Sequence, residues 1–469
     1  MFQRETAETA LLDLEGLDAL YFLLKGELRD YPVFFVNYLL EKGFIVPGSP
    51  DGALGRRRPE LVEGVEAVRD AAPATTAPPR SLAAPETIHF SVTGRCDQAC
   101  AGCFYSARPG SDVEAADAPF PLFEKVVAEA GKASVFQMAL GGGEPLLHPR
   151  ILDMVRLARE NGIVPNLTTN GNLLDREMAA ALKKAGLGQV QISLNGVTED
   201  TNQKTRPNFQ ATMAAIEACR EVGLRWGPNF LLTRSNLAEL ESVIELGRRL
   251  GAASVNILRP KPPTTESDWL ERESLDSAGY RQVQKILAAG RRSQVASRRS
   301  HVASPKLQAS IVCDLRPETC DLRPETCDLR PETCDLRPET CDLRPETCDL
   351  KPETRITLDA SLTFLLTDRS PEQLYHAGVW GCTAARKFVT ITQDGAVLPC
   401  SHVRWSDVGE GDFMRAWWES EVFARFRAQE EEMRGRCRGC SYLELCKGCR
   451  AVVMAFGGDF EDSDPHCLR

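Results

Sequence analysis

The sequence predicts an α/β protein whose centre is a partial (β/α)6 barrel of the TIM type. Two observations support this fold class. From residue 87 onward, six short apolar runs alternate with helical stretches of about 10–15 residues, and segments rich in glycine or cysteine follow several of the runs. The alternation favours parallel strands joined by right-handed helical crossovers, which curl a sheet into a full or partial barrel. Because ligands of barrels bind at the carboxyl ends of the strands, we expect functional residues just after the runs.

The barrel core is expected to span residues 87–300. Its six strands are predicted, in chain order, at Ile88–Val92, Ser134–Leu140, Ile163–Thr168, Gln189–Leu194, Trp226–Leu232 and Ser254–Leu258. The helices predicted between them include Ile151–Asn161, Arg176–Ala185, Thr212–Val222 and Leu237–Leu250.

Two further segments precede the barrel. Residues 1–70 have apolar positions at helical spacing, and a short apolar run follows Gly43, where a helix is expected to end. Helices that close on a short strand predict a small winged-helix-like module, and a plain helical appendage is the alternative. Residues 71–86 are rich in alanine and proline and are expected to form a linker.

A tandem repeat follows the barrel. Six copies of Cys-Asp-Leu-Arg-Pro-Glu-Thr fill residues 313–354, the last with Lys351 in place of arginine. A proline in every copy prevents a continuous helix, and cysteines separated by six residues do not match a tetrahedral metal site. Near-identity of the copies favours recent duplication in a tolerant loop, so residues 301–354 are predicted to be a disordered insertion. A metal-binding or peptide-mimicking role is the alternative.

Composition and charge exclude several classes of protein. The chain of 469 residues is 43% hydrophobic and 26% charged, as globular proteins are, and its net charge of −10 argues against nucleic acid as a partner. No run approaches about 18 consecutive apolar residues and no secretory signal is visible, so we expect a cytoplasmic protein without a membrane partner. In a reducing compartment, 17 cysteines indicate metal ions or clusters instead of disulfides.

Three cysteines follow the first predicted strand directly, at Cys96, Cys100 and Cys103. Three thiolates this close can bind three irons of a 4Fe–4S cluster and leave the fourth iron open. A zinc site would need a fourth Cys or His at short spacing, and none is present. The spacing therefore predicts an iron–sulfur cluster with one open iron.

Polar and glycine-rich segments follow the next three predicted strands. Gly141-Gly142-Gly143-Glu144-Pro145 comes after the second strand, where glycines let the backbone approach a ligand and Glu144 offers a carboxylate to an ammonium group. Thr169-Asn170-Gly171 and Ser193-Leu194-Asn195-Gly196 follow the third and fourth strands. Ordinary turn chemistry explains these two segments equally well.

Seven more cysteines lie near the C-terminus, at Cys382, Cys400, Cys437, Cys440, Cys446, Cys449 and Cys467. Asp394-Gly395 between alternating apolar residues predicts a hairpin that returns Cys400 close to Cys382. Two structural zinc sites are the alternative, because Cys-x2-Cys pairs often bind zinc. Seven cysteines, however, do not divide into two sites of four sulfurs.

Taken together, these motifs resemble those of radical S-adenosylmethionine (SAM) enzymes with a C-terminal SPASM domain, over residues 86–469 apart from the repeat. One departure is Gly102, where the family usually has an aromatic residue before the third cysteine. The short spacer Lys447-Gly448 resembles that of some members related to pyrroloquinoline-quinone and haem d1 biosynthesis. The chain as a whole resembles the group that contains these members and the peptide maturases.

The resemblance implies SAM and three 4Fe–4S clusters as cofactors, with a SPASM domain over residues 355–469. The SAM contacts that it implies are Gly142, Gly143, Glu144, Ser193, Asn195 and Arg206, with Phe104 or Tyr105 in place of the missing aromatic. It also implies one auxiliary cluster on Cys437, Cys440, Cys446 and Cys467. A second auxiliary cluster would use Cys382, Cys400 and Cys449, without an obvious fourth cysteine. No catalytic side chain is assigned.

The resemblance further implies an oxidoreductase that cleaves SAM reductively to an adenosyl radical and cross-links a ribosomally made peptide. The N-terminal module would bind the leader of that peptide, and a flavodoxin or ferredoxin would supply electrons. Haem- or quinone-type cofactor biosynthesis and maturation of a sulfatase are the alternatives within the family. A non-catalytic electron-transfer protein is an alternative of another class, although it would need neither an open iron nor the motif around Glu144.

Overall fold

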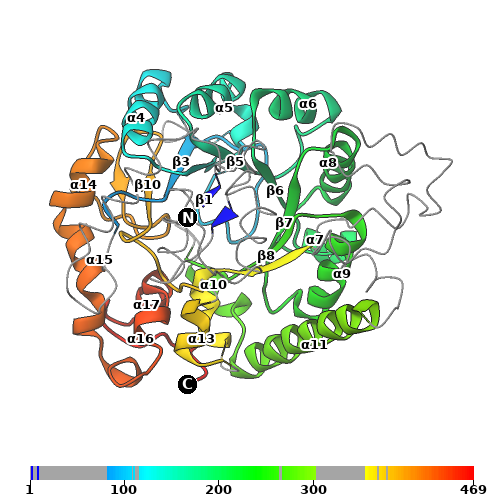
Figure 1. The fold of residues 1–469 in the computed structure, drawn as a ribbon, viewed down its shortest axis with the longest axis vertical. Helices are drawn as coiled ribbons and strands as arrows, with labels where there is room; N and C mark the ends of the chain where they lie inside the picture. Colours follow the sequence, from blue (N-terminus) through cyan, green and yellow to red (C-terminus); the bar gives the residue numbers. More distant parts are fainter. Residues whose placement is uncertain are drawn as a thin grey trace, which may run out of the picture.

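The computed structural model describes residues 2–3, 8–9, 82–107, 109–110, 116–262, 267–302, 354–366, 369–376 and 379–469. A nine-stranded sheet forms the centre of this part of the chain, in the order β11-β10-β3-β4-β5-β6-β7-β8-β9 (Figure 1). Its strands are β3 (Thr87–Thr93), β4 (Gln137–Gly142), β5 (Val164–Thr169), β6 (Gln189–Ser193), β7 (Trp226–Leu231), β8 (Ser254–Leu258), β9 (Arg355–Leu358), β10 (Phe388–Ile391) and β11 (Val397–Leu398). Neighbouring strands pair in parallel except β10 and β11, so the predicted α/β class with a mostly parallel sheet is confirmed.

The six strands predicted for the barrel are all present, as β3 to β8. The largest difference concerns β4, which was expected from Ser134 and begins at Gln137. Ser134 adopts a left-handed backbone conformation with φ of 57°, which turns the chain out of the preceding helix before the strand can begin.

Helices cover the outer side of the curved sheet, as Figure 1 shows. Between the barrel strands they are α4 (Phe120–Lys132), α5 (Ile151–Glu160), α6 (Arg176–Ala185), α7 (Glu199–Gln203), α8 (Phe209–Val222) and α9 (Leu240–Leu250), followed by α10 (Ser267–Glu273) and α11 (Ser277–Val302). Helix α6 has the predicted bounds because Asp175 caps it by accepting a hydrogen bond from Met178 N (2.8 Å) and Gly186 ends it at φ of 96°. The C-terminal part adds α13 (Pro371–His376), α14 (Phe413–Glu419), α15 (Glu421–Glu432), α16 (Leu443–Cys446) and α17 (Arg450–Ala455). Short 3-10 turns lie at Pro145–Leu147, Leu237–Glu239, Ala360–Leu365 and Gly435–Cys437.

The two faces of the sheet carry different side chains. On the outer face, the buried ring of Phe90 meets that of Phe123 in α4 edge to face, at a centroid distance of 5.1 Å. On the inner face, the amide nitrogen of Asn256 in β8 donates to Gln191 of β6 (2.6 Å) and to Asn229 of β7 (2.8 Å). Since successive side chains of a strand point to opposite faces, the inside of the partial barrel is lined by amides.

Two strands beyond the predicted six extend the sheet at both edges. β9 pairs with β8, with Arg355 opposite Ser254, and β10 pairs with β3, with Phe388 opposite Thr87. The sequence analysis placed residues 355–469 in a separate domain and did not predict this pairing. Strands that pair across hundreds of residues leave no local pattern, and β9 and β10 are short.

Several predicted segments lie outside the described residues. Of the module expected at residues 1–70, the structure describes β1 (Phe2–Gln3) and β2 (Glu8–Thr9), which pair antiparallel. The linker up to residue 81 and the repeat up to residue 353 also lie outside, whereas α11 continues beyond the expected end of the core to Val302. No helix among the described residues is long and apolar enough to cross a membrane.

Candidate functional site

The loop that directly follows β3 carries the first three cysteines, Cys96, Cys100 and Cys103, and lies at the carboxyl edge of the sheet. Asp97 in this loop accepts hydrogen bonds from Asn170 Nδ2 (2.7 Å) and Asn172 Nδ2 (2.9 Å), which follow β5. These contacts hold the cysteine loop against the segment that follows β5. Sequence reasoning missed Asp97, because an aspartate in a loop carries no signal of a distant partner.

The thiols of Cys96 and Cys100 lie in surroundings that disfavour free thiolates. Burial, together with the negative charges of Glu144 and Cys100, raises the pKa of Cys96 to about 11. A cationic group bound to the thiolates would offset this cost, since metals hold coordinating thiols in the deprotonated form. The donor set therefore fits an iron–sulfur cluster.

Two buried donors beside the cysteine loop, Arg206 Nε and Gln98 Nε2, have no hydrogen-bond acceptor among the described residues. Gln98 Oε1 accepts from Cys100 Sγ (3.3 Å) and from Arg206 Nη1 (3.5 Å). Burial raises the pKa of Cys100, and the positive charge of Arg206 lowers it. Because buried donors in native proteins nearly always have an acceptor, this pair fits an anionic group such as the carboxylate expected for Arg206. Gln98 was not predicted.

The glycines after β4 bring the backbone of this edge against the cysteine loop. A Cβ built at Gly143 would lie 2.0 Å from Arg95 O, and one at Gly142, whose φ is 116°, would lie 2.3 Å from Thr93 O. A Cβ at Gly141 would meet nothing within 4 Å. Gly142 and Gly143 are therefore required by backbone contact with the cysteine loop, and their contact with SAM stays a prediction.

The carboxylate of Glu144 is buried and already bonded. It accepts hydrogen bonds from Thr169 Oγ1 (2.7 Å), Asn170 N (2.8 Å) and Leu146 N (3.1 Å). Its pKa is raised to about 7, because the effect of burial outweighs the lowering by these hydrogen bonds. A carboxylate has about four acceptor sites, so one remains for the predicted ammonium group while the others tie the loop to β5.

Asn195, which follows β6, bonds to the segment around Thr205 and to β7. The side chain of Asn195 donates from Nδ2 to Thr205 Oγ1 (2.9 Å) and accepts from Leu231 N of β7 (3.2 Å). Ser193 lies at the last position of β6 and is 9% exposed. Both of these hydrogen bonds of Asn195 are to other residues of the protein. Contacts of Asn195 and Ser193 with SAM stay predictions.

Phe104 and Tyr105 contact residues of the C-terminal part. The ring of Phe104 lies 4.4 Å from that of His402 between centroids, and Tyr105 Oη donates to Gln393 Oε1 (2.7 Å). Gln393 belongs to the turn between β10 and β11, and His402 follows that hairpin. These contacts join the cysteine loop to the hairpin, so a role of either ring toward SAM stays a prediction.

Trp269 of α10 fills the space beside Gly102, where the family motif usually has an aromatic residue. A Cβ built at Gly102, whose φ is 67°, would lie 2.4 Å from three carbons of the indole ring. Trp269 is 4% exposed, and its helix α10 follows β8, the last of the six barrel strands in the sequence. No local signal connects the two positions, so the sequence analysis could not find this contact.

The predicted hairpin is confirmed and brings three thiols together. β10 and β11 pair antiparallel with Ile391 opposite Val397, and Cys400 follows. Burial, together with the nearby negative charges of Cys382 and Cys449, raises the pKa of Cys400 to about 12. These three residues are the set that the sequence analysis grouped.

The sequence analysis grouped the remaining C-terminal cysteines, Cys437, Cys440, Cys446 and Cys467, all of which are free. Cys440 N donates to Cys437 O (3.1 Å), and burial raises the pKa of Cys446 to about 12, with Cys467 and Cys437 among the charges that add to it. Cys382 N donates to Cys446 O (3.2 Å), so the two groups adjoin. Among the described residues, no three Cys, His, Asp or Glu side chains are arranged to hold a single metal ion.

Two family models match this chain. The radical SAM superfamily matches residues 90–247, and SPASM, an iron–sulfur cluster-binding domain, matches residues 382–441. This chain is a radical SAM enzyme with a SPASM domain. The cofactors of the family are SAM with an iron–sulfur cluster in the core and auxiliary iron–sulfur clusters in the SPASM domain.

Similar proteins include enzymes with different substrates. An AdoMet-dependent heme synthase of Methanosarcina barkeri is 26% identical over 393 residues, which cover 82% of this chain and 97% of that protein. A PqqA peptide cyclase of Gluconobacter oxydans is 26% identical over 407 residues, which cover 83% and 90%. The crystal structures of Streptococcus suis SuiB, bound to S-adenosylmethionine and to precursor peptide SuiA, give a TM-score of 0.61 at 15% identity and cover 100% of this chain and 96% of SuiB. This last similarity shows the fold.

The contact between the glycines and the cysteine loop predicts a difference between two alanine variants. Gly143→Ala should lower the free energy of unfolding by about 1–3 kcal/mol, because its Cβ collides with backbone. Gly141→Ala, the matched control in open space, should stay within about 0.5 kcal/mol of the unchanged protein. Denaturant unfolding measures both, and equal effects of the two variants would contradict the packing.

Proposed function

We propose that this enzyme cleaves SAM reductively and uses the adenosyl radical to cross-link a ribosomally made peptide oxidatively. In this proposal Cys96, Cys100 and Cys103 hold the cluster that binds SAM through its open iron. The auxiliary clusters are held by the two C-terminal groups, one by Cys437, Cys440, Cys446 and Cys467 and the other by Cys382, Cys400 and Cys449. The proposed domains are a radical SAM core at residues 87–300 and a SPASM domain at residues 355–469.

The observation that carries the proposal is the contact between the cysteine loop after β3 and the hairpin that precedes Cys400. Phe104 touches His402, and Tyr105 donates to Gln393, so the loop and the hairpin meet directly. A substrate bound beside this contact would reach both the site of hydrogen abstraction and an electron acceptor. Electron transfer without SAM chemistry would not require this arrangement.

A reduced cluster with an open iron supplies the electron that breaks a carbon–sulfur bond of SAM. The side chains of the protein bind and orient the cofactor. Arg206 and Gln98 provide the unpartnered donors for its carboxylate, and Glu144 provides one free acceptor site for its ammonium group. Because all three groups are at the buried carboxyl edge of the sheet, they also help to exclude water from the reacting bond.

A peptide fits the inner face of the barrel better than a porphyrin does. The amides of Gln191, Asn229 and Asn256 bond to one another, and their other polar atoms could exchange hydrogen bonds with peptide groups, whereas an apolar ring would offer those atoms no partner. PqqA peptide cyclase acts on a peptide, as its name states, and SuiB was solved with one. The heme synthase at 26% identity supports the second candidate, modification of a haem-type molecule. Leader binding by residues 1–70 and a flavodoxin or ferredoxin as electron donor belong to the same proposal.

The three thiol groups predict the iron content. Anaerobic reconstitution should give about twelve irons per chain, four for each cluster. Replacing Cys96, Cys100 and Cys103 together by Ala should remove about four, and so should replacing Cys437, Cys440, Cys446 and Cys467. The control is Cys219→Ala, because Cys219 is fully buried in α8 away from all three groups. Iron and sulfide analysis would contradict the assignment if Cys219→Ala lost iron or the group variants kept it.

A cross-linking reaction predicts the mass of its product. The test incubates the enzyme with SAM, a reductant and the peptides of any short open reading frames found beside its gene, and a substrate should become lighter by two hydrogen atoms for each cross-link. One hydrogen atom leaves to the adenosyl fragment, and the other leaves as a proton and an electron that an auxiliary cluster accepts. Mass spectrometry measures the loss, with SAM omitted as the control. If the enzyme converts a porphyrin and none of the peptides tested, the haem-type alternative is correct and the peptide proposal is wrong.

A further inference from the structure

A buried ion pair joins the barrel to the C-terminal segment of the SPASM part. Arg259 directly follows β8, and its guanidinium donates to both oxygens of Asp464, at 2.7 and 2.8 Å. The two side chains are 1% and 2% exposed. A fully buried, bidentate pair has a fixed geometry, so it sets the distance between these two segments.

The carboxylate of Asp464 also contacts the backbone of one thiol group. It accepts from Cys449 N (2.9 Å) and from His466 N (3.0 Å). The carbonyl oxygen of Asp464 accepts from Cys467 N (3.1 Å), which belongs to the other thiol group. One residue therefore holds the backbone beside a cysteine of each group.

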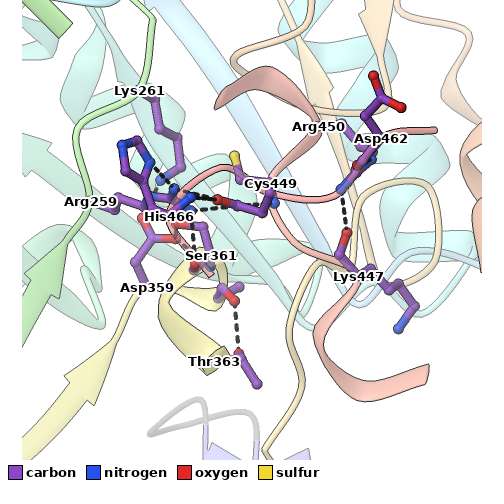
Figure 2. Close-up of polar contacts among 12 residues, drawn as sticks. Arg259, Lys261, Asp359, Ser361, Thr363, Lys447, Cys449, Arg450, Asp462 and His466 are labelled. Carbon is purple, nitrogen blue, oxygen red and sulfur yellow. Dashed lines mark hydrogen bonds and ion pairs between the residues drawn. The ribbon is translucent and has the colours of Figure 1, made fainter. Parts of the chain in front are cut away.

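Arg259 continues the network to the segment after β9. It donates from Nη1 to Ser361 O (3.2 Å) and from Nη2 to His466 Nδ1 (2.7 Å). Ser361 in turn donates from N (2.9 Å) and Oγ (2.8 Å) to Asp359, which forms an ion pair with Lys261 (Figure 2). The segments that follow β8 and β9 are thus joined, through the Arg259–Asp464 pair, to the backbone beside both thiol groups.

The backbone of the two-residue spacer between Cys446 and Cys449 lies against the side chain of Asp464. Lys447 and Gly448 both have left-handed backbone conformations, with φ of 58° and 61°. A Cβ built at Gly448 would lie 2.9 Å from the Cβ of Asp464. The close approach leaves no room for a side chain at position 448, and it keeps both thiol groups against the ion pair.

Each charge of the pair acts on the neighbouring thiols. Both charges lie beside these cysteines, because Asp464 bonds to the backbone N–H of Cys449 and of Cys467, and Arg259 bonds to Asp464. The intact pair is neutral as a whole. Removing one partner would leave an uncompensated charge in a buried environment, where screening is weak.

We propose that the Arg259–Asp464 ion pair positions both auxiliary cluster sites and balances the charge beside them. This inference rests on the proposed function, in which the two C-terminal thiol groups hold clusters. Asp464 and Arg259 act here as positioning residues, because they contact the backbone around Cys449 and Cys467 and no reacting atom. Net charge near a cluster is one of the factors that set its reduction potential.

The test replaces each charge separately and measures reduction potentials of the reconstituted full chain. Arg259→Met leaves a buried negative charge and should lower both auxiliary potentials, since reduction adds a further electron. Asp464→Asn leaves a buried positive charge, keeps an acceptor for Cys449 N, and should raise them. We expect the ratio of reduced to oxidised cluster at a fixed potential to change about tenfold in each case, which is about 59 mV for one electron.

Four references separate the effect of charge from damage to the fold. The double variant Arg259→Met/Asp464→Asn should return both potentials toward those of the unchanged protein, and Arg259→Lys should stay close to them because it keeps the charge. Arg425→Met removes the partly exposed pair of Arg425 with Glu461 (2.8 Å) in the same part of the chain and should change neither potential. The cluster on Cys96, Cys100 and Cys103 serves as an internal reference that none of these variants shifts.

The outcomes are distinct. Shifts of opposite sign that cancel in the double variant support the proposal, and so does loss of auxiliary iron in a single variant that the double variant restores. Shifts of the same sign, no shift, or loss of iron in the double variant as well would overturn it. An unchanged protein that binds no auxiliary iron would instead refute the proposed function on which the inference rests.

Discussion

The parallel pairing of β10 with β3 is the constraint on which the rest of the structure depends. β3 leads directly into the loop with the first three cysteines, and β10 leads through its hairpin to Cys400. Because adjacent parallel strands end at the same edge of a sheet, the two cysteine-bearing segments must emerge side by side. The contact of Phe104 with His402 is the local result of that pairing.

Side chains from neighbouring strands then give the carboxyl edge its shape. Asp97 and Glu144 hold the loops after β3, β4 and β5 to one another, and Arg259 holds the end of β8 to Asp464. All of these groups are polar and at least partly buried, so each must have a partner or lose stability. Among the described residues, Arg206 Nε and Gln98 Nε2 are two of several buried polar atoms without a partner, and their place beside the first three cysteines fits a bound ligand.

Local patterns in the sequence were sufficient for the elements but not for their long-range contacts. The six barrel strands, the Asp175 and Gly186 ends of α6 and the Asp394-Gly395 hairpin were predictable, because periodicity, caps and turn residues act over a few positions. The grouping of the cysteines into cluster sites was inferred from spacing and resemblance and stays a prediction. The pairing of β9 and β10 with the barrel, Trp269 beside Gly102 and the Arg259–Asp464 pair were not predictable, since each joins residues far apart in the chain. The predicted module at residues 1–70 and the repeat lie outside the residues that the structure describes.

The most direct test of the central claim is whether the reconstituted chain cleaves SAM when it is reduced under anaerobic conditions. The account predicts 5′-deoxyadenosine from the unchanged protein and from Cys219→Ala, and none from the variant in which Cys96, Cys100 and Cys103 are all replaced by Ala. Chromatography of the adenosine products measures this. A chain that carries its full iron and yet forms no 5′-deoxyadenosine would contradict the account and would leave an electron-transfer protein.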